Sequence, residues 1–206
     1  MRKILAGLLS LVGFGNAGAQ PPSPPPAEMA SGLRSMVLNL TPGEIGMSSD
    51  NSQGTVWGVV METGMDGGFY TLVALADGTT SLYFSTGGGI IGAGEHESVR
   101  AASRDFLASA NQFASAAAPV TDTAPPGRGS TQFFLLTFDG LRSYRAPEVD
   151  LGEERDPFAP MFHSGHAVIS ALRLAQPGGL TIRPSRRHFV ARLNSGVRRL
   201  SQRNRA

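Results

Sequence analysis

Hydrophobic residues in the first half of the chain follow the two-residue period of β-strands. In the run 55–62 both odd and even positions are mostly apolar, which is typical of a central strand with both faces covered. A second apolar run covers 69–76, and a third at 79–85 follows the pair Asp77-Gly78. An Asp-Gly pair between two such runs predicts a hairpin, because both central residues of the tight turn need positive φ.

From Glu95 to Ala118 the period changes, and apolar residues recur every three or four positions. This spacing predicts an amphipathic helix. A second hairpin is predicted around Asp139-Gly140, and a second helix over Met161–Ala175. The order β-β-β-α-β-β-α predicts an α+β fold, with a single, mostly antiparallel five-stranded sheet and two main helices.

The N-terminus has the order of a secretory signal peptide: basic residues, an 11-residue apolar run, and then Ala17-Gly18-Ala19. We therefore expect cleavage after Ala19 and an exported protein, periplasmic or secreted, without a transmembrane segment after cleavage. A mis-assigned start codon before a cytoplasmic protein is the alternative. The predicted division of the chain is a signal peptide at 1–19, a proline-rich spacer at 20–32, an α+β domain at 33–180 and a basic tail at 181–206.

Two residue types are nearly missing, and their scarcity excludes several chemistries. The chain has no cysteine, which excludes disulfides, thiolate nucleophiles and cysteine-ligated metals. Its one lysine, Lys3, lies in the predicted signal peptide, so the mature chain has no Schiff-base lysine and no P-loop lysine. We predict no cofactor.

The charges are strongly segregated along the chain. Residues 20–182 contain eight arginines and sixteen acidic residues, a net charge of −8, whereas residues 183–206 contain eight arginines and no acid, a net charge of +8. In the tail Phe189, Leu193, Val197 and Leu200 recur at helical spacing among the arginines. Segments of this kind typically bind an anionic membrane surface, a nucleic acid or an acidic partner. The alternative roles for the tail are that it folds back on the acidic body or serves as a solubilising extension.

A glycine-rich stretch, S-T-G-G-G-I-I-G-A-G-E-H-E at 85–97, contains the pattern G-x-G-x-x-G. A dinucleotide loop needs a parallel strand before it and a helix that starts within the glycines. Here the preceding strand belongs to a hairpin, and helical spacing starts only after Gly94. We therefore predict no dinucleotide site but a sharp connection, with Glu95 and Glu97 in the first turn of the helix, where carboxylates offset the helix dipole.

Three histidines are candidate metal ligands. His163 and His166 are three residues apart at the start of the second predicted helix, and His96 stands at the start of the first. If the two helix starts lie side by side, His96, His163, His166 and a glutamate converge, and this ligand set suits zinc or another divalent ion. Capping of a helix or binding to a nearby carbonyl is the alternative role. For Ser164, between the two histidines, we expect a role as N-cap of the helix.

Three segments carry a resemblance to known proteins: V-W-G-V-V-M-E-T-G, the stretch from A-D-G-T-T-S-L-Y-F-S to E-S-V-R-A-A, and F-F-L-L-T-F-D-G-L-R. They resemble a family of uncharacterised bacterial proteins over roughly residues 33–175. The element order is similar to the profilin-like layout of roadblock and longin domains. The resemblance implies a fold without known activity or catalytic residues, and a homodimer, since profilin-like domains often pair through a helix or a sheet edge.

Together these observations favour a non-catalytic module over an enzyme. We expect it to bind a protein partner or a second copy of itself, with the basic tail for anionic surfaces. The competing prediction is a metal-assisted hydrolase with its site near the glycine-rich stretch and His96, His163 and His166.

Overall fold

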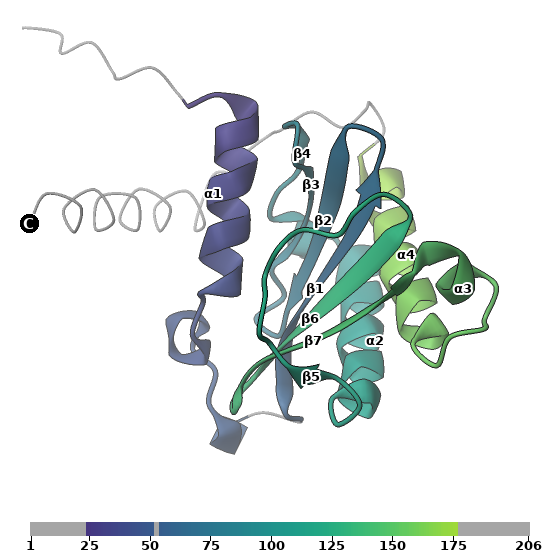
Figure 1. Cartoon of the computed structure of the whole chain (residues 1–206). Helices are drawn as coiled ribbons and strands as arrows, with labels where there is room; N and C mark the ends of the chain where they lie inside the picture. Colours follow the sequence, from purple (N-terminus) through teal and green to yellow (C-terminus); the bar gives the residue numbers. More distant parts are fainter. Residues whose placement is uncertain (1–23, 52–53, 177–206) are drawn as a thin grey trace, which may run out of the picture.

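A computed structural model describes residues 24–51 and 54–176 of the chain. The fold is α+β, with one antiparallel sheet between helices on its two faces (Figure 1). Neighbouring strands follow the order β4-β3-β2-β1-β6-β7-β5. Their bounds are β1 Val56–Met65, β2 Gly68–Leu75, β3 Thr80–Phe84, β4 Gly89–Ile90, β5 Ala118–Pro119, β6 Ser130–Thr137 and β7 Gly140–Pro147.

The sheet has seven strands, so the prediction of five strands is wrong in this detail. The five expected strands are present, and β1 lies at the centre between β2 and β6. The two additional strands, β4 and β5, have two residues each and form the two edges. A two-residue strand is too short to display a period, and for this reason the sequence pattern does not reveal it.

Both predicted hairpins form, but with different turns from those expected. Gly78 and Gly140 have φ values of +88° and +116°, whereas the preceding aspartates do not have positive φ. In the first turn the backbone N–H of Thr79 donates to the Asp77 carboxylate at 2.9 Å. The glycine of each pair therefore provides the required conformation, and the aspartate of the first pair stabilises its turn with its side chain.

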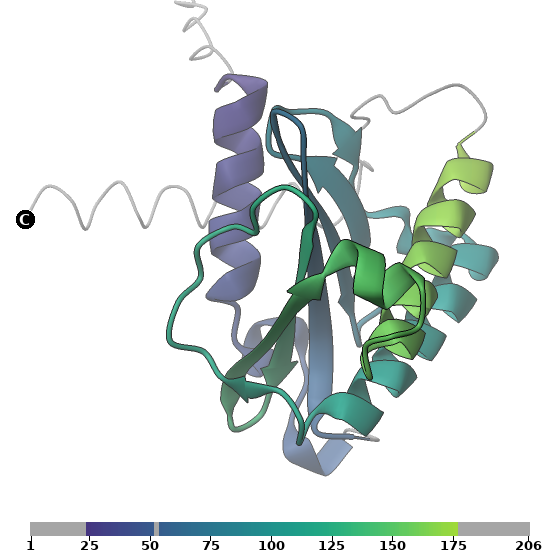
Figure 2. The same ribbon diagram turned by 45° about the vertical axis from the view of Figure 1, so that its right-hand side comes forward.

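Two long helices, α2 (Glu97–Phe113) and α4 (Ala159–Ala175), cover one face of the sheet. They lie close to the predicted ranges, and the short helix α3 (Glu148–Gly152) packs beside α4. Between this face and the helices lies the larger apolar core, whose fully buried members include Met61, Phe106 and Phe133. Figure 2 shows the helix pair on this face and α1 on the other.

Helix α1 (Pro26–Leu38) covers the opposite face. Its buried residues, Ala30, Leu33 and Val37, pack on a second apolar cluster. The helix begins inside the predicted spacer at 20–32, and the predicted boundary at residue 33 falls in its middle. Proline is well tolerated at the first positions of a helix. Pro26, the last proline of the run, is therefore already the first residue of α1, and the second half of the predicted spacer is helical.

Short 3₁₀ helices complete the structure: η1 at Pro42–Ile45, η2 at Ser49–Asn51 and η3 at Ala93–Glu95. The predicted signal peptide and the basic tail lie outside the described residues. Among the residues that the structure does describe, no helix has the length and apolar character needed to cross a membrane.

Candidate functional site

Polar side chains form a row across the α1 face of the sheet. Glu62 on β1 is paired directly with Thr71 on β2 and with Gln132 on β6. The row extends to Arg145 on β7, which is the partner of Gln132, and to Tyr83 on β3, which is the partner of Thr71. Residues opposite one another in a sheet share a face, so these five side chains cross five neighbouring strands in line.

Arg34 reaches this row from α1. Its Nε and Nη2 donate to the two oxygens of the Glu62 carboxylate, each at 2.8 Å, and the Thr71 hydroxyl donates to Oε1 at 3.0 Å. The Glu62 side chain is fully buried, whereas that of Arg34 is 15% exposed. The carboxylate thus has the paired and hydrogen-bonded environment that a buried charge needs.

Two aromatic rings lie beside the Arg34 guanidinium. Its central carbon is 5.7 Å from the centroid of Phe69 and 5.9 Å from that of Phe134. Both distances lie within the range of a cation–π attraction. The ion pair and the rings together fix the position of α1 along β1, because a shift of the helix by one turn would separate Arg34 from Glu62.

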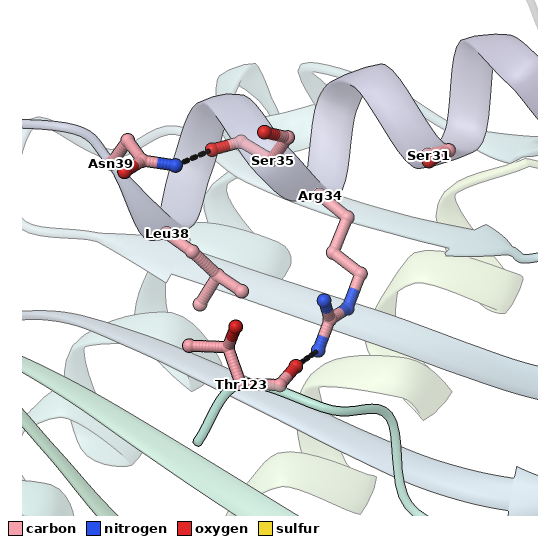
Figure 3. Close-up of a pocket in the computed structure, with 6 residues that line it drawn as sticks. All are labelled: Ser31, Arg34, Ser35, Leu38, Asn39 and Thr123. Atoms are coloured by element: carbon pink, nitrogen blue, oxygen red, sulfur yellow. Dashed lines mark hydrogen bonds between the residues drawn. The ribbon is translucent and has the colours of Figure 1, made fainter. Parts of the chain in front are cut away.

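The 120–129 loop forms the other side of this site. Arg34 Nη2 donates to the carbonyl of Thr123 at 2.6 Å, and Arg145 donates to the carbonyl of Ala124 at 2.9 Å and to the Gln132 side chain. Figure 3 shows Arg34 reaching from α1 to Thr123. A polar pocket of about 200 Å³ lies between the helix and this loop, and its lining residues are Ser31, Arg34, Ser35, Leu38, Asn39 and Thr123.

Two buried polar groups on this face have no hydrogen-bond partner among the described residues: the indole N–H of Trp57 and the hydroxyl of Tyr83. Burial, and secondly the charge of Glu62, raise the pKa of Tyr83 above its usual value. A buried unpaired group costs about 1–3 kcal/mol. The α1 layer therefore combines one well-satisfied ion pair with buried polar groups that the described residues do not all pair.

Of the three histidines of the predicted metal site, His163 and His166 both lie against the Phe162 ring on α4, whereas His96 stands at the start of α2. His96 is the exposed N-cap residue of α2, without a side-chain cap bond. His163 Nε2 lies 3.9 Å from Glu154 Oε1, and His166 Nε2 lies 3.4 Å from the Tyr70 hydroxyl. Burial, followed by the charges of His163 and Arg173, lowers the pKa of His166.

Within residues 24–51 and 54–176 no three His, Asp or Glu side chains are grouped closely enough to hold a metal ion. The metal site therefore stays a prediction, and the geometry gives no reason to propose it. The predicted N-cap role of Ser164 is wrong. Ser164 lies inside α4, which starts five residues earlier, and its hydroxyl donates to the carbonyl of Pro160 at 3.0 Å.

The glycine-rich stretch is a tight connection between β3 and α2. Gly87, Gly88, Gly89 and Gly92 all have positive φ. A Cβ on Gly94 would lie 1.7 Å from the carbonyl oxygen of Gly78, so this position requires glycine. The strand before it is antiparallel to its neighbours, as expected, and Glu97 pairs with Arg100 at 3.4 Å on the first turns of α2.

No local pattern in the sequence marks Arg34, Gln132 and Arg145 as parts of one site. One signal was present, because Glu62 is the single acid in an apolar strand, and such a residue needs a partner. Its partner is 28 positions away, a separation that no local period reveals. In comparisons with known proteins, no family model, no curated protein and no solved structure matches this chain.

Proposed function

We propose that the protein is an exported binding module that attaches to an anionic membrane surface through its basic tail. The observation that carries this proposal is the segregation of charge. The chain from residue 20 to residue 182 has a net charge of −8, and the segment that follows has a net charge of +8. Arginines grouped with apolar residues at helical spacing suit an anionic lipid surface, which attracts the charge and accepts the apolar side chains.

The candidate site supports a binding module more than an enzyme, because its polar atoms are engaged in holding the fold. The two oxygens of Glu62 accept three hydrogen bonds, and Arg34 and Arg145 bind carbonyls of the 120–129 loop. We therefore assign the row a positioning role: it joins α1, the sheet and the loop into one face. Self-association as a homodimer belongs to the same proposal, and native mass spectrometry measures it.

Co-sedimentation with lipid vesicles tests the attachment. The mature chain 20–206 is compared with the chain truncated after Ile182, which lacks all eight arginines of the tail. We expect the full mature chain to sediment with vesicles of phosphatidylglycerol and phosphatidylcholine, and not with phosphatidylcholine alone. Binding should weaken steeply with salt, by roughly 1 kcal/mol for each arginine near the surface that salt screens. Equal sedimentation of the two chains would contradict the proposal.

A further inference from the structure

The surface formed by α3 and α4 exposes large apolar side chains. Val149 on α3 is 55% exposed and Leu174 on α4 is 82% exposed. These two helices pack against each other, and Figure 1 shows them side by side on the face away from α1. Each of these two side chains offers apolar area that a segment lying along the helices would cover.

Helix α3 and the residues directly after it contain the densest group of acids in the described chain. Residues 148–156 contain five carboxylates and one arginine. Arg155 pairs with Asp150 and Glu153, and the Glu154 side chain is 80% exposed. An excess of four negative charges remains after Arg155 is counted, so the partner that fits this surface carries positive charge as well as apolar side chains.

A segment of this chain has both properties and follows α4 directly. The described chain ends at Gln176, two residues after Leu174, and 30 residues follow. They contain eight arginines and no acid, together with Phe189 and the apolar residues spaced after it. The 13 positions from Gln176 to Phe189 span up to about 45 Å when extended, which is enough to return to α3.

We propose that the basic tail docks on the α3–α4 surface of its own chain, and that docking competes with attachment to an anionic membrane surface. This inference rests on the proposed function and adds its regulation. Covalent connection gives the tail a local concentration of millimolar order at this surface, so even weak contacts keep it bound. Because charge contributes most of the attraction, salt or an anionic surface releases the tail.

The absence of cysteine makes a distance measurement direct, since engineered cysteines are the only labelling sites. In the mature chain, Ser195→Cys in the tail is combined with Ala167→Cys, at an exposed position of α4. The control pair combines Ser195→Cys with Thr86→Cys, in the exposed loop at the β4 edge of the sheet. Both pairs carry spin labels, and electron–electron double resonance gives the distance distributions.

At low salt we expect a narrow, short distance for the α4 pair and a longer one for the control pair. At about 1 M salt, where the Debye length is only ~3 Å, the short distance should broaden and lengthen. Replacing Glu148, Asp150, Glu153 and Glu154 by their amides should release the tail at low salt. The matched control replaces Glu28, Glu95, Asp105 and Asp139, four exposed acids elsewhere, by their amides and should keep the short distance.

Two outcomes would overturn docking: a distance for the α4 pair that does not respond to salt, or equal responses to the two sets of four substitutions. Vesicle binding separates this inference from the proposed function. If docking competes with lipid, the variant with amides at Glu148, Asp150, Glu153 and Glu154 should bind anionic vesicles about fivefold or more tightly than the control variant with four substitutions elsewhere. If both variants bind vesicles equally and the binding still requires the tail, the competition is refuted but the attachment is not. If the distance measurement shows a docked tail but the mature chain does not bind vesicles, the attachment is refuted but the docking is not.

Discussion

The two faces of the sheet are covered by helices in different ways. On one face α4 alone buries seven residues, including Met161, Phe162 and Leu172. On the other face α1 buries three residues of moderate size or smaller, and its position depends on the Arg34–Glu62 pair. The comparison shows that the helix pair supplies most of the apolar core, whereas α1 is positioned by polar contacts.

The two layers also differ in the polar groups they bury. The α1 layer contains the unpartnered Trp57 N–H and Tyr83 hydroxyl, whereas on the helix-pair face buried hydroxyls are paired, as Thr63 is with Thr131 at 2.9 Å. Unpaired buried groups lower stability, and apolar burial raises it. We therefore expect α1 to be the less stable layer.

The largest effect should come from truncating the core of the helix-pair face. Phe106→Ala removes a fully buried ring of α2 and should cost about 4 kcal/mol of unfolding free energy, whereas Leu33→Ala on α1 should cost about 2 kcal/mol. Urea unfolding followed by circular dichroism measures both. A larger cost for Leu33→Ala than for Phe106→Ala would reverse the comparison.

The ion pair should show a strong coupling between its members. Arg34→Met leaves the buried Glu62 carboxylate without its partner and should cost about 3 kcal/mol. The double variant Arg34→Met, Glu62→Leu removes both charges and should lie within about 1 kcal/mol of the unmodified protein. A double-mutant cycle from urea unfolding gives the coupling. Additive costs would show that the two side chains act independently.

Two helical glycines allow a matched test of packing on the two faces. A Cβ on Gly32 of α1 would have no atom within 4 Å, whereas a Cβ on Gly165 of α4 would lie 2.8 Å from Met61 Sδ. Gly32→Ala should therefore stabilise the protein by about 0.5–1 kcal/mol through helix propensity, and Gly165→Ala should destabilise it by about 1 kcal/mol. Thermal unfolding of the two variants compares them, and stabilisation by Gly165→Ala would indicate a loosely packed helix pair.

The smallest effect is a pH dependence on the helix-pair face. Burial lowers the pKa of His166 in the folded chain below the usual value of 6.5. Between pH 6.5 and the lowered pKa, His166 therefore binds a proton in the unfolded chain but not in the folded chain. This contribution to stability is present above that pH and is lost as the pH falls through the lowered pKa. His166→Gln should reduce the slope of stability against pH in that window, as measured by urea unfolding at several pH values. The same slope in His166→Gln and in the unmodified protein would contradict this.

Local patterns were sufficient to predict much of the sheet and one helix pair. The strands β1, β2 and β6 are long enough for their apolar runs to be recognised, and α2 shows its helical spacing through Val99, Phe106 and Ala110. The ion pair between Glu97 and Arg100 has the same local origin, because residues three apart on a helix face each other. Such features depend on neighbours in the sequence.

The rest of the fold and the candidate site depend on distant contacts. Strands β4 and β5 exist only because β3 and β7 offer partners to two-residue segments. Arg34 has no local partner, and its contacts with Glu62 and Thr123 span 28 and 89 positions. The spacing of His163 and His166 places both on α4, and His96 stands at the start of α2 as expected. Whether the three side chains converge depends on how the two helices pack, which no local period reveals.

Hydrogen exchange measured by mass spectrometry on the mature chain tests the difference between the two faces most directly. Backbone amides of α1 should exchange through local opening, faster than those of α2 and α4, which should approach the protection of β1. Arg34→Met should speed exchange in α1 before it affects the helix pair. Protection of α1 equal to that of α2 and α4 would contradict the account, because α1 would then unfold only with the whole domain.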